Sequence, residues 1–127
     1  MRSGSRCWLL AIIWMFPGCG GKADAPSPAE ITERAWHAHE VVIAAGENAK
    51  DCVEAGRAMQ AAFAVHRQAF VEAMTLDADK ERLGQAADYI EKQGDRYKII
   101  ETRMEVLSDR CGDEPTVAAA FHQMESP

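Results

Sequence analysis

Basic side chains are scarce in this sequence. Its 127 residues contain 14 Lys and Arg against 20 Asp and Glu, which gives a formal net charge of −6 at pH 7. A general affinity for nucleic acid or for an anionic lipid surface depends on clustered Lys and Arg. The composition therefore argues against both, and we expect no nucleic-acid partner.

The motifs that usually carry catalysis are also missing. Beyond residue 28, serine occurs only at Ser108 and Ser126, and no Gly-rich loop joins a strand pattern to a helix. Hydrolase triads and nucleotide-binding loops are therefore without support. No Cys-x-x-Cys or Cys-x-x-Cys-His occurs, which removes the signatures of thiol oxidoreductases and of covalent haem attachment. We expect a protein that is not an enzyme and that holds no cofactor.

Long apolar runs are missing too, apart from one near the N-terminus. Residues 7–16 (CWLLAIIWMF) are an apolar run of ten residues that follows Arg2 and Arg6. A helix needs about 20 apolar residues to span a bilayer, so this run is too short to be a transmembrane helix. A charged start followed by a short apolar run is typical of an export signal. We therefore predict a bacterial signal peptide over residues 1–18.

The residues after the apolar run resemble the lipobox of bacterial lipoprotein precursors. Residues 16–19 read Phe-Pro-Gly-Cys, and a stretch containing Gly and Pro follows. The resemblance covers about the first twenty residues. It implies that Cys19 is lipidated and anchors the mature chain in a bilayer, with residues 19–27 as the lipidated cysteine and a flexible tether. Gly20, where an Asp would favour the inner membrane, implies the outer membrane of the cell envelope, facing the periplasm or the cell surface. The alternative is an ordinary signal cut near Gly18 or Ala23, which leaves Cys19 as a free thiol or in an intermolecular bridge.

The remaining residues, 28–124, have the composition and spacing of a helical domain. β-Branched residues are few, whereas Ala, Glu, Gln, Arg and Met are common. Capping boxes at residues 27–30 and 51–54 start two helices. Residues 75–79 and 113–115 are typical of the turns before a third and a fourth helix. We predict an all-α, up-down bundle of three long helices and a short C-terminal helix.

The third helix is expected to run without interruption from Lys80 to Cys111. Its apolar positions follow alternating steps of three and four residues, which is typical of a long helix packed nearly parallel to its neighbours. Only Gln93 interrupts the apolar series. The positions on this stripe are Leu83, Ala86, Ile90, Gln93, Tyr97, Ile100, Met104, Leu107 and Cys111.

Two cysteines lie at matching ends of the predicted helices. Cys52 opens the second helix and Cys111 closes the third. If these helices form an antiparallel hairpin, both thiols lie at the same end of the bundle. In an oxidising envelope compartment they are expected to form a disulfide that staples the domain, rather than a metal or redox site.

The position of the turn between these two helices is ambiguous. A hairpin that brings Cys52 and Cys111 together turns near residues 81–82, whereas the turn-forming residues are at 76–79. Either the turn extends through residues 83–84, or the third helix bends at Gly94.

The histidines and methionines suggest a haem or metal hypothesis. His66, with Met59 one heptad before it, or His39 and His122, at a similar height in an ideal bundle, could supply ligands. An isolated histidine on an apolar stripe is more often a hydrogen-bonded core residue. His37, with a glutamate about one turn to either side, is expected on a solvated face. We therefore predict no metal site, and keep as candidate ligands only His39, Met59, His66 and His122.

Our functional hypothesis follows from the predicted export signal, the predicted lipid anchor and the predicted fold. We expect a non-enzymatic, membrane-anchored envelope lipoprotein whose helical bundle binds an unidentified envelope protein. If the short fourth helix leaves the core uncovered, Met59, Phe63 and Phe121 would form an exposed apolar slot for a partner helix or a lipid chain. The alternative is a small haem- or metal-binding helical bundle in the periplasm.

Overall fold

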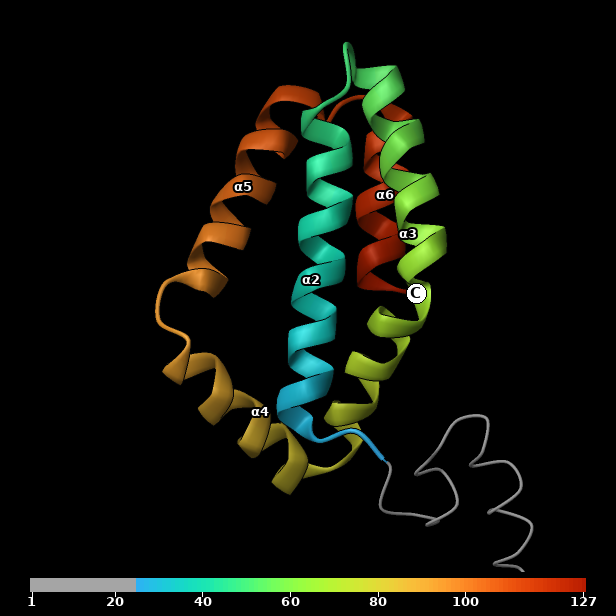
Figure 1. Cartoon of the computed structure of the whole chain (residues 1–127). Helices are drawn as coiled ribbons and strands as arrows, with labels where there is room; N and C mark the ends of the chain where they lie inside the picture. Colours follow the sequence, from blue (N-terminus) through green and yellow to red (C-terminus); the bar gives the residue numbers. More distant parts are fainter. Residues whose placement is uncertain (1–24) are drawn as a thin grey trace, which may run out of the picture.

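The computed structural model describes residues 25–127, and nearly all of them are helical (Figure 1). No β-strand occurs in this part of the chain, so the all-α prediction is confirmed. The predicted signal peptide, Cys19 and the tether up to residue 24 lie outside the described residues. The elements are α2 (Pro28–Glu47), α3 (Cys52–Met74), the 3-10 helix η3 (Thr75–Ala78), α4 (Lys80–Lys92), α5 (Arg96–Cys111) and α6 (Pro115–Glu125).

Local side-chain caps determine where the helices start. The Ser27 hydroxyl accepts a hydrogen bond from the Glu30 amide at 3.1 Å, and the Asp51 carboxylate accepts one from the Glu54 amide at 2.8 Å. Each cap satisfies a backbone donor that the first helical turn leaves free. Asp79 caps α4 in the same way. The predicted starts of α2 and α3 are therefore confirmed.

The prediction of one continuous helix from Lys80 to Cys111 is wrong, because α4 and α5 are separate helices. Gly94 lies between them with φ of +62°, a left-handed conformation that favours glycine. Gln93, the polar residue in the predicted apolar series, is the C-cap of α4. Of the two alternatives for the turn, Gly94 is the right position, but the chain ends one helix and begins another there instead of bending a single helix. Residues 83–84 lie inside α4.

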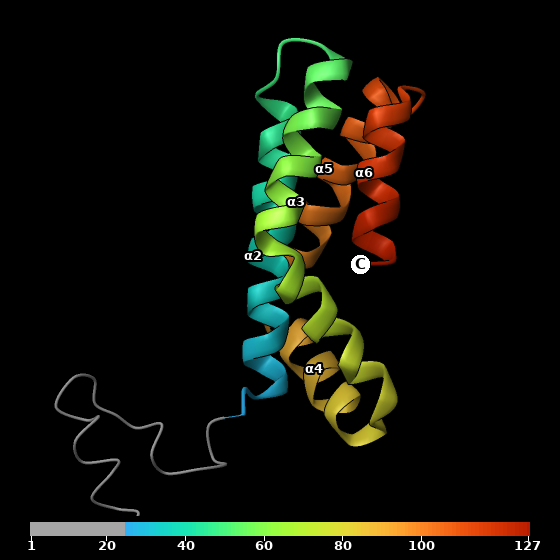
Figure 2. The same ribbon diagram turned by 90° about the vertical axis from the view of Figure 1, so that its right-hand side faces the viewer.

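Four helices surround the main core. Helices α2 and α3 pack side by side and antiparallel, α6 packs on α3, and α5 lies beside α2 (Figures 1 and 2). Helix α4 crosses the lower end and contacts α2 and η3. Because α6 is short, it runs along only the upper part of α3 (Figure 2). The main core consists of Ala38, Val42, Ala55, Met59, Phe63, Phe70, Leu107, Cys111, Val117, Ala120 and Met124.

A disulfide joins the start of α3 to the end of α5. Cys52 and Cys111 are bonded, with their α-carbons 5.3 Å apart and a sequence separation of 59 residues. The predicted pairing is therefore confirmed. The break at Gly94 and the oblique course of α4 let α5 return to the end of the bundle where α3 begins (Figure 1).

Helix α6 lies very close to α3 at Gly56. A Cβ built on this glycine would lie 2.5 Å from the backbone carbonyl carbon of Thr116. Near this contact the Gln60 side-chain amide donates a hydrogen bond to the Thr116 carbonyl at 2.9 Å. Only a residue without a side chain lets α6 lie this close to α3, so Gly56 sets the position of α6.

We expect Gly56→Ala to lower the free energy of unfolding by about 1–3 kcal/mol, because α6 must move away from α3. Gly84 provides the matched control, since a Cβ there would contact nothing within 4 Å. Gly84→Ala is expected to raise the free energy of unfolding by up to about 1 kcal/mol through helix propensity. Urea unfolding followed by circular dichroism measures both. Equal effects of the two substitutions would contradict the close approach at Gly56.

Candidate functional site

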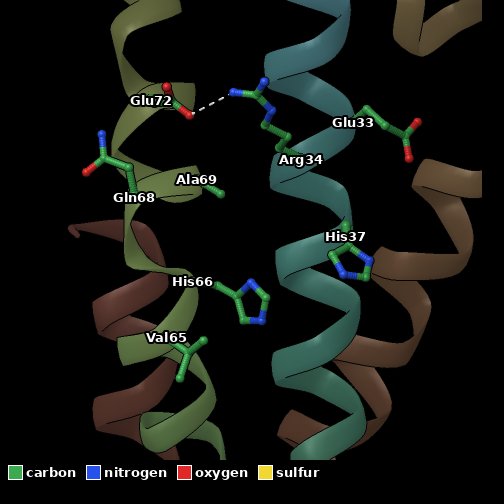
Figure 3. A pocket seen from close by; sticks show the side chains of 8 residues that line it. All are labelled: Glu33, Arg34, His37, Val65, His66, Gln68, Ala69 and Glu72. Atoms are coloured by element: carbon green, nitrogen blue, oxygen red, sulfur yellow. Dashed lines mark ion pairs between the residues drawn. The ribbon is translucent and has the colours of Figure 1, made fainter. Parts of the chain in front are cut away.

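An open groove lies between the outer faces of α2 and α3 (Figure 3). Its volume is about 500 Å³. Arg34 of α2 points toward Glu72 of α3, and the two are ion-paired at 3.5 Å. The side chain of Val65 in this groove is 78% exposed. The lining residues of this α2–α3 groove are Glu33, Arg34, His37, Val65, His66, Gln68, Ala69 and Glu72.

Two histidines meet in the α2–α3 groove. The ring centres of His37 and His66 are 5.9 Å apart, with their planes nearly perpendicular. The sequence predicted His37 on a solvated face, and its side chain is exposed. His66 is half-buried and points toward α2 (Figure 3). The pair joins adjacent helices, which spacing within one helix could not reveal.

The other candidate metal ligands are His39, Met59 and His122, and the surroundings of each are different. His39 hydrogen-bonds through Nδ1 to the Ala35 carbonyl at 2.8 Å, and its ring packs on Phe70 with centres 4.7 Å apart. Met59 is fully buried in the main core. His122 is exposed on α6. Within residues 25–127, no three His, Cys, Asp or Glu side chains are grouped so that they could hold a metal ion.

The burial of His39 makes stability depend on pH. Burial lowers the pKa of His39 below its ordinary value of 6.5, although the hydrogen bond to Ala35 opposes this. As pH falls below 6.5, the unfolded chain binds a proton that the folded chain does not, so stability is lost. The pKa values of Glu33 and Glu47 are lowered from 4.5, so both stay ionised over this interval.

We expect the free energy of unfolding to fall between about pH 7.5 and about pH 5.5, and His39→Phe to reduce that fall. Phenylalanine keeps the aromatic contact with Phe70 and removes the titrating group. Urea unfolding at both pH values measures the difference. If the variant shows the same fall as the unsubstituted protein, His39 does not carry the pH dependence.

A cluster of charged and aromatic side chains holds α5 against α2. The Arg96 guanidinium donates to Glu33 at 2.6 Å and to Glu40 at 2.9 Å, and lies 5.2 Å from the centre of the Trp36 ring. The Tyr89 hydroxyl donates to Glu33 at 2.6 Å. These hydrogen bonds lower the pKa of Glu33 and raise that of Arg96. We call Glu33, Trp36, Glu40, Tyr89 and Arg96 the Arg96 cluster.

The sequence did not predict the Arg96 cluster. Its hydrogen bonds join residues 56 to 63 positions apart, and nothing in local spacing marks them. Arg103 and Glu47 make a second link between the same helices, with two hydrogen bonds of 3.1 and 2.6 Å. Both links fasten α5 to α2 and leave the opposite side of α5 free.

A second groove lies between α5 and α6. Its volume is about 420 Å³. The predicted apolar slot is only partly right, because Met59 and Phe63 are buried in the main core and are 0% and 5% exposed. Phe121 does line this groove. The lining residues of this α5–α6 groove are Met104, Glu105, Ser108, Gly112, Ala118, Phe121, His122 and Glu125.

Nothing in the described helices is built to cross a bilayer, because none in residues 25–127 is both long enough and apolar enough. Comparisons with protein-family models, with curated proteins and with solved structures found no match. Candidate functional features of residues 25–127 include the Cys52–Cys111 disulfide, the Arg96 cluster, the α2–α3 groove and the α5–α6 groove.

Proposed function

We propose that this chain is a lipid-anchored protein of the bacterial cell envelope and that its helical bundle is a non-enzymatic protein-binding module. Residues 1–18 direct export, Cys19 carries the lipid in the outer membrane, and residues 20–27 tether the bundle. The disulfide between Cys52 and Cys111 keeps the bundle folded. The chain works by holding a binding surface close to the membrane.

The Cys52–Cys111 disulfide is the observation that carries this proposal. Structural disulfides persist in oxidising compartments and are rare where thiols are kept reduced. The thiols are brought together from positions 59 residues apart, with α-carbons at 5.3 Å. A structural disulfide therefore supports export to an oxidising compartment, and the N-terminal sequence, which resembles a lipoprotein export signal, supports the same location.

Exposed apolar side chains support a binding role. On α5, Ile99 and Val106 are 55% and 59% exposed. They are seven residues apart, so they lie on the same side of the helix. Solvated apolar groups that cluster on one face are typical of surfaces that contact another protein.

The anchor has a direct test. In a bacterial host fed labelled palmitate, the full precursor is expected to take up label, and Cys19→Ser is expected to abolish it. Cys7 lies in the apolar part of the predicted signal, so Cys7→Ser is the matched control and should keep the label. Label that survives Cys19→Ser, or an unlabelled unsubstituted protein, would rule out the anchor.

One observation favours a second function, the binding of a transition metal. Two imidazoles on a tetrahedral metal, at metal–nitrogen distances near 2.0–2.1 Å, place their ring centres about 5 Å apart. The ring centres of His37 and His66 are 5.9 Å apart, which is close to this separation. Zinc binding that is lost in His66→Ala and kept in His122→Ala would support this function.

A further inference from the structure

The four helices around the main core leave one seam open. Helix α3 packs closely on α2 and on α6, and α5 is fastened to α2 by the Arg96 cluster. Helices α5 and α6 are joined by only residues 112–114, yet they are not a closely packed pair. The α5–α6 groove occupies this seam.

The lining residues of the α5–α6 groove come from one face of each helix. On α5 they lie at 104, 105 and 108, and Gly112 follows directly after the helix ends at Cys111. On α6 they recur at 118, 121, 122 and 125. Residues at these spacings lie in a row along a helix. The groove therefore runs along α6 for about 10 Å, which is about two turns of a partner helix.

The floor of the groove is apolar. Met104 and Phe121 are half-buried and pack against the main core from its edge. Ala118 is exposed and keeps the entrance open. Methionine is flexible and polarizable, so it adapts to apolar side chains of different shapes. An apolar helix face placed here would continue the core outward.

The rim of the groove is acidic. Glu105 of α5 and Glu125 of α6 line it, and none of the Lys or Arg side chains of residues 25–127 does. The formal charge of the chain is −6. A second copy of the chain would bring further negative charge to this rim, and an acyl chain would gain nothing from it. A cationic partner is complementary to it.

We infer that the α5–α6 groove binds an amphipathic helix of a partner protein, with the apolar face of that helix on Met104 and Phe121. Lysine or arginine side chains beside this face pair with Glu105 and Glu125. This inference rests on the proposed binding function and gives the partner its chemistry. Recognition of this kind places apolar anchors at helical spacing in a groove between helices.

The test uses residues 20–127, exported without the lipid anchor, so that every described residue is present. The probe is a fluorescent 18-residue amphipathic peptide made of Leu and Lys, and its binding is measured by anisotropy. Ala118→Lys places a positive charge in the groove and is expected to weaken binding at least tenfold. Ala119 is also exposed and does not line the groove, so Ala119→Lys should change binding less than twofold. A peptide with Glu in place of Lys should not bind measurably.

A second pair of variants keeps the test valid if Ala118→Lys fails to fold. Neutralising Glu105 and Glu125 together, as Glu105→Gln with Glu125→Gln, is expected to weaken binding at least threefold. The control neutralises two exposed acids of α4, as Asp88→Asn with Glu91→Gln, and should leave binding within twofold.

Several results would overturn the inference. They are equal effects of Ala118→Lys and Ala119→Lys, no binding of the Lys peptide, self-association through the groove, and preferential binding to lipid vesicles. Palmitate labelling at Cys19 does not depend on the groove. Label without peptide binding would therefore defeat this inference and leave the anchored protein in place, whereas loss of label would defeat the proposed anchor.

Discussion

Replacing both disulfide cysteines, as Cys52→Ala with Cys111→Ala, is expected to lower the free energy of unfolding by about 4 kcal/mol. The bond closes a chain segment with a sequence separation of 59 residues, and its removal restores the conformational freedom of that segment in the unfolded state. Single domains of this size have a total stability of only about 5–15 kcal/mol. The loss is therefore a large share of what keeps the bundle folded.

Urea unfolding under oxidising conditions measures this effect, and the reduced unsubstituted protein is the control. Reduction breaks the bond but keeps both side chains, of which Cys111 is only 3% exposed. If the reduced protein and the double variant lose similar stability, the constraint on the unfolded chain is the cause. A loss below about 1 kcal/mol in both would contradict the role of the disulfide as a staple.

Trp36→Ala is expected to have the second large effect, a loss of about 3–5 kcal/mol in the free energy of unfolding. Trp36 is 5% exposed and packs with Ile43 and Ile100 between α2 and α5. The ring also contacts Tyr89 and Tyr97, with centres 5.9 and 6.3 Å away. Truncation to alanine removes this packing and leaves a cavity where α5 meets α2.

Arg96→Met measures how much the charged groups of the Arg96 cluster contribute to stability, separately from the burial of Trp36. The side chains of Arg96, Glu33 and Glu40 are 30%, 43% and 32% exposed, so solvent screens their ion pairs. A loss of about 1–2 kcal/mol is expected from the two ion pairs and the contact with the Trp36 ring. Lys98→Met, at an exposed position of the same helix, should change stability by less than about 0.5 kcal/mol. A larger loss in Arg96→Met than in Trp36→Ala would show that charge, and not burial, holds α5 in place.

The starts of the helices were predictable because the interactions that set them are local. Ser27 and Asp51 each cap an amide three residues further on, and this spacing is visible in sequence. The disulfide was predictable for a related reason. Its cysteines lie at the ends of two helices, and an antiparallel arrangement of such helices brings those ends together.

The break between α4 and α5 was not predictable from periodicity. Apolar positions keep their spacing of three and four residues across Gln93 and Gly94, so the pattern is the same for one helix and for two. The left-handed conformation of Gly94 depends on how α4 packs across the end of the bundle and how α5 packs on α2. Those contacts are tertiary and leave no local mark.

The two grooves depend on lateral packing, which sequence spacing does not report. Met59 and Phe63 were expected to be open to a partner if α6 left the core uncovered, but both are buried in the main core together with residues of α2, α5 and α6. Phe121 alone of the three expected residues lines the α5–α6 groove. The Arg96 cluster, with partners 56 to 63 residues apart, was beyond any local pattern.

The central claim is a lipid-anchored binding module that the Cys52–Cys111 disulfide stabilises. Its most direct test is the native intact mass of the protein, purified from the envelope membranes of a bacterial host that expresses the full precursor. We predict a chain that begins at Cys19, carries added acyl groups, and is two hydrogens lighter than the reduced form because Cys52 and Cys111 are bonded. A chain cut elsewhere without acyl groups, or one that carries haem or a metal ion, would contradict the account.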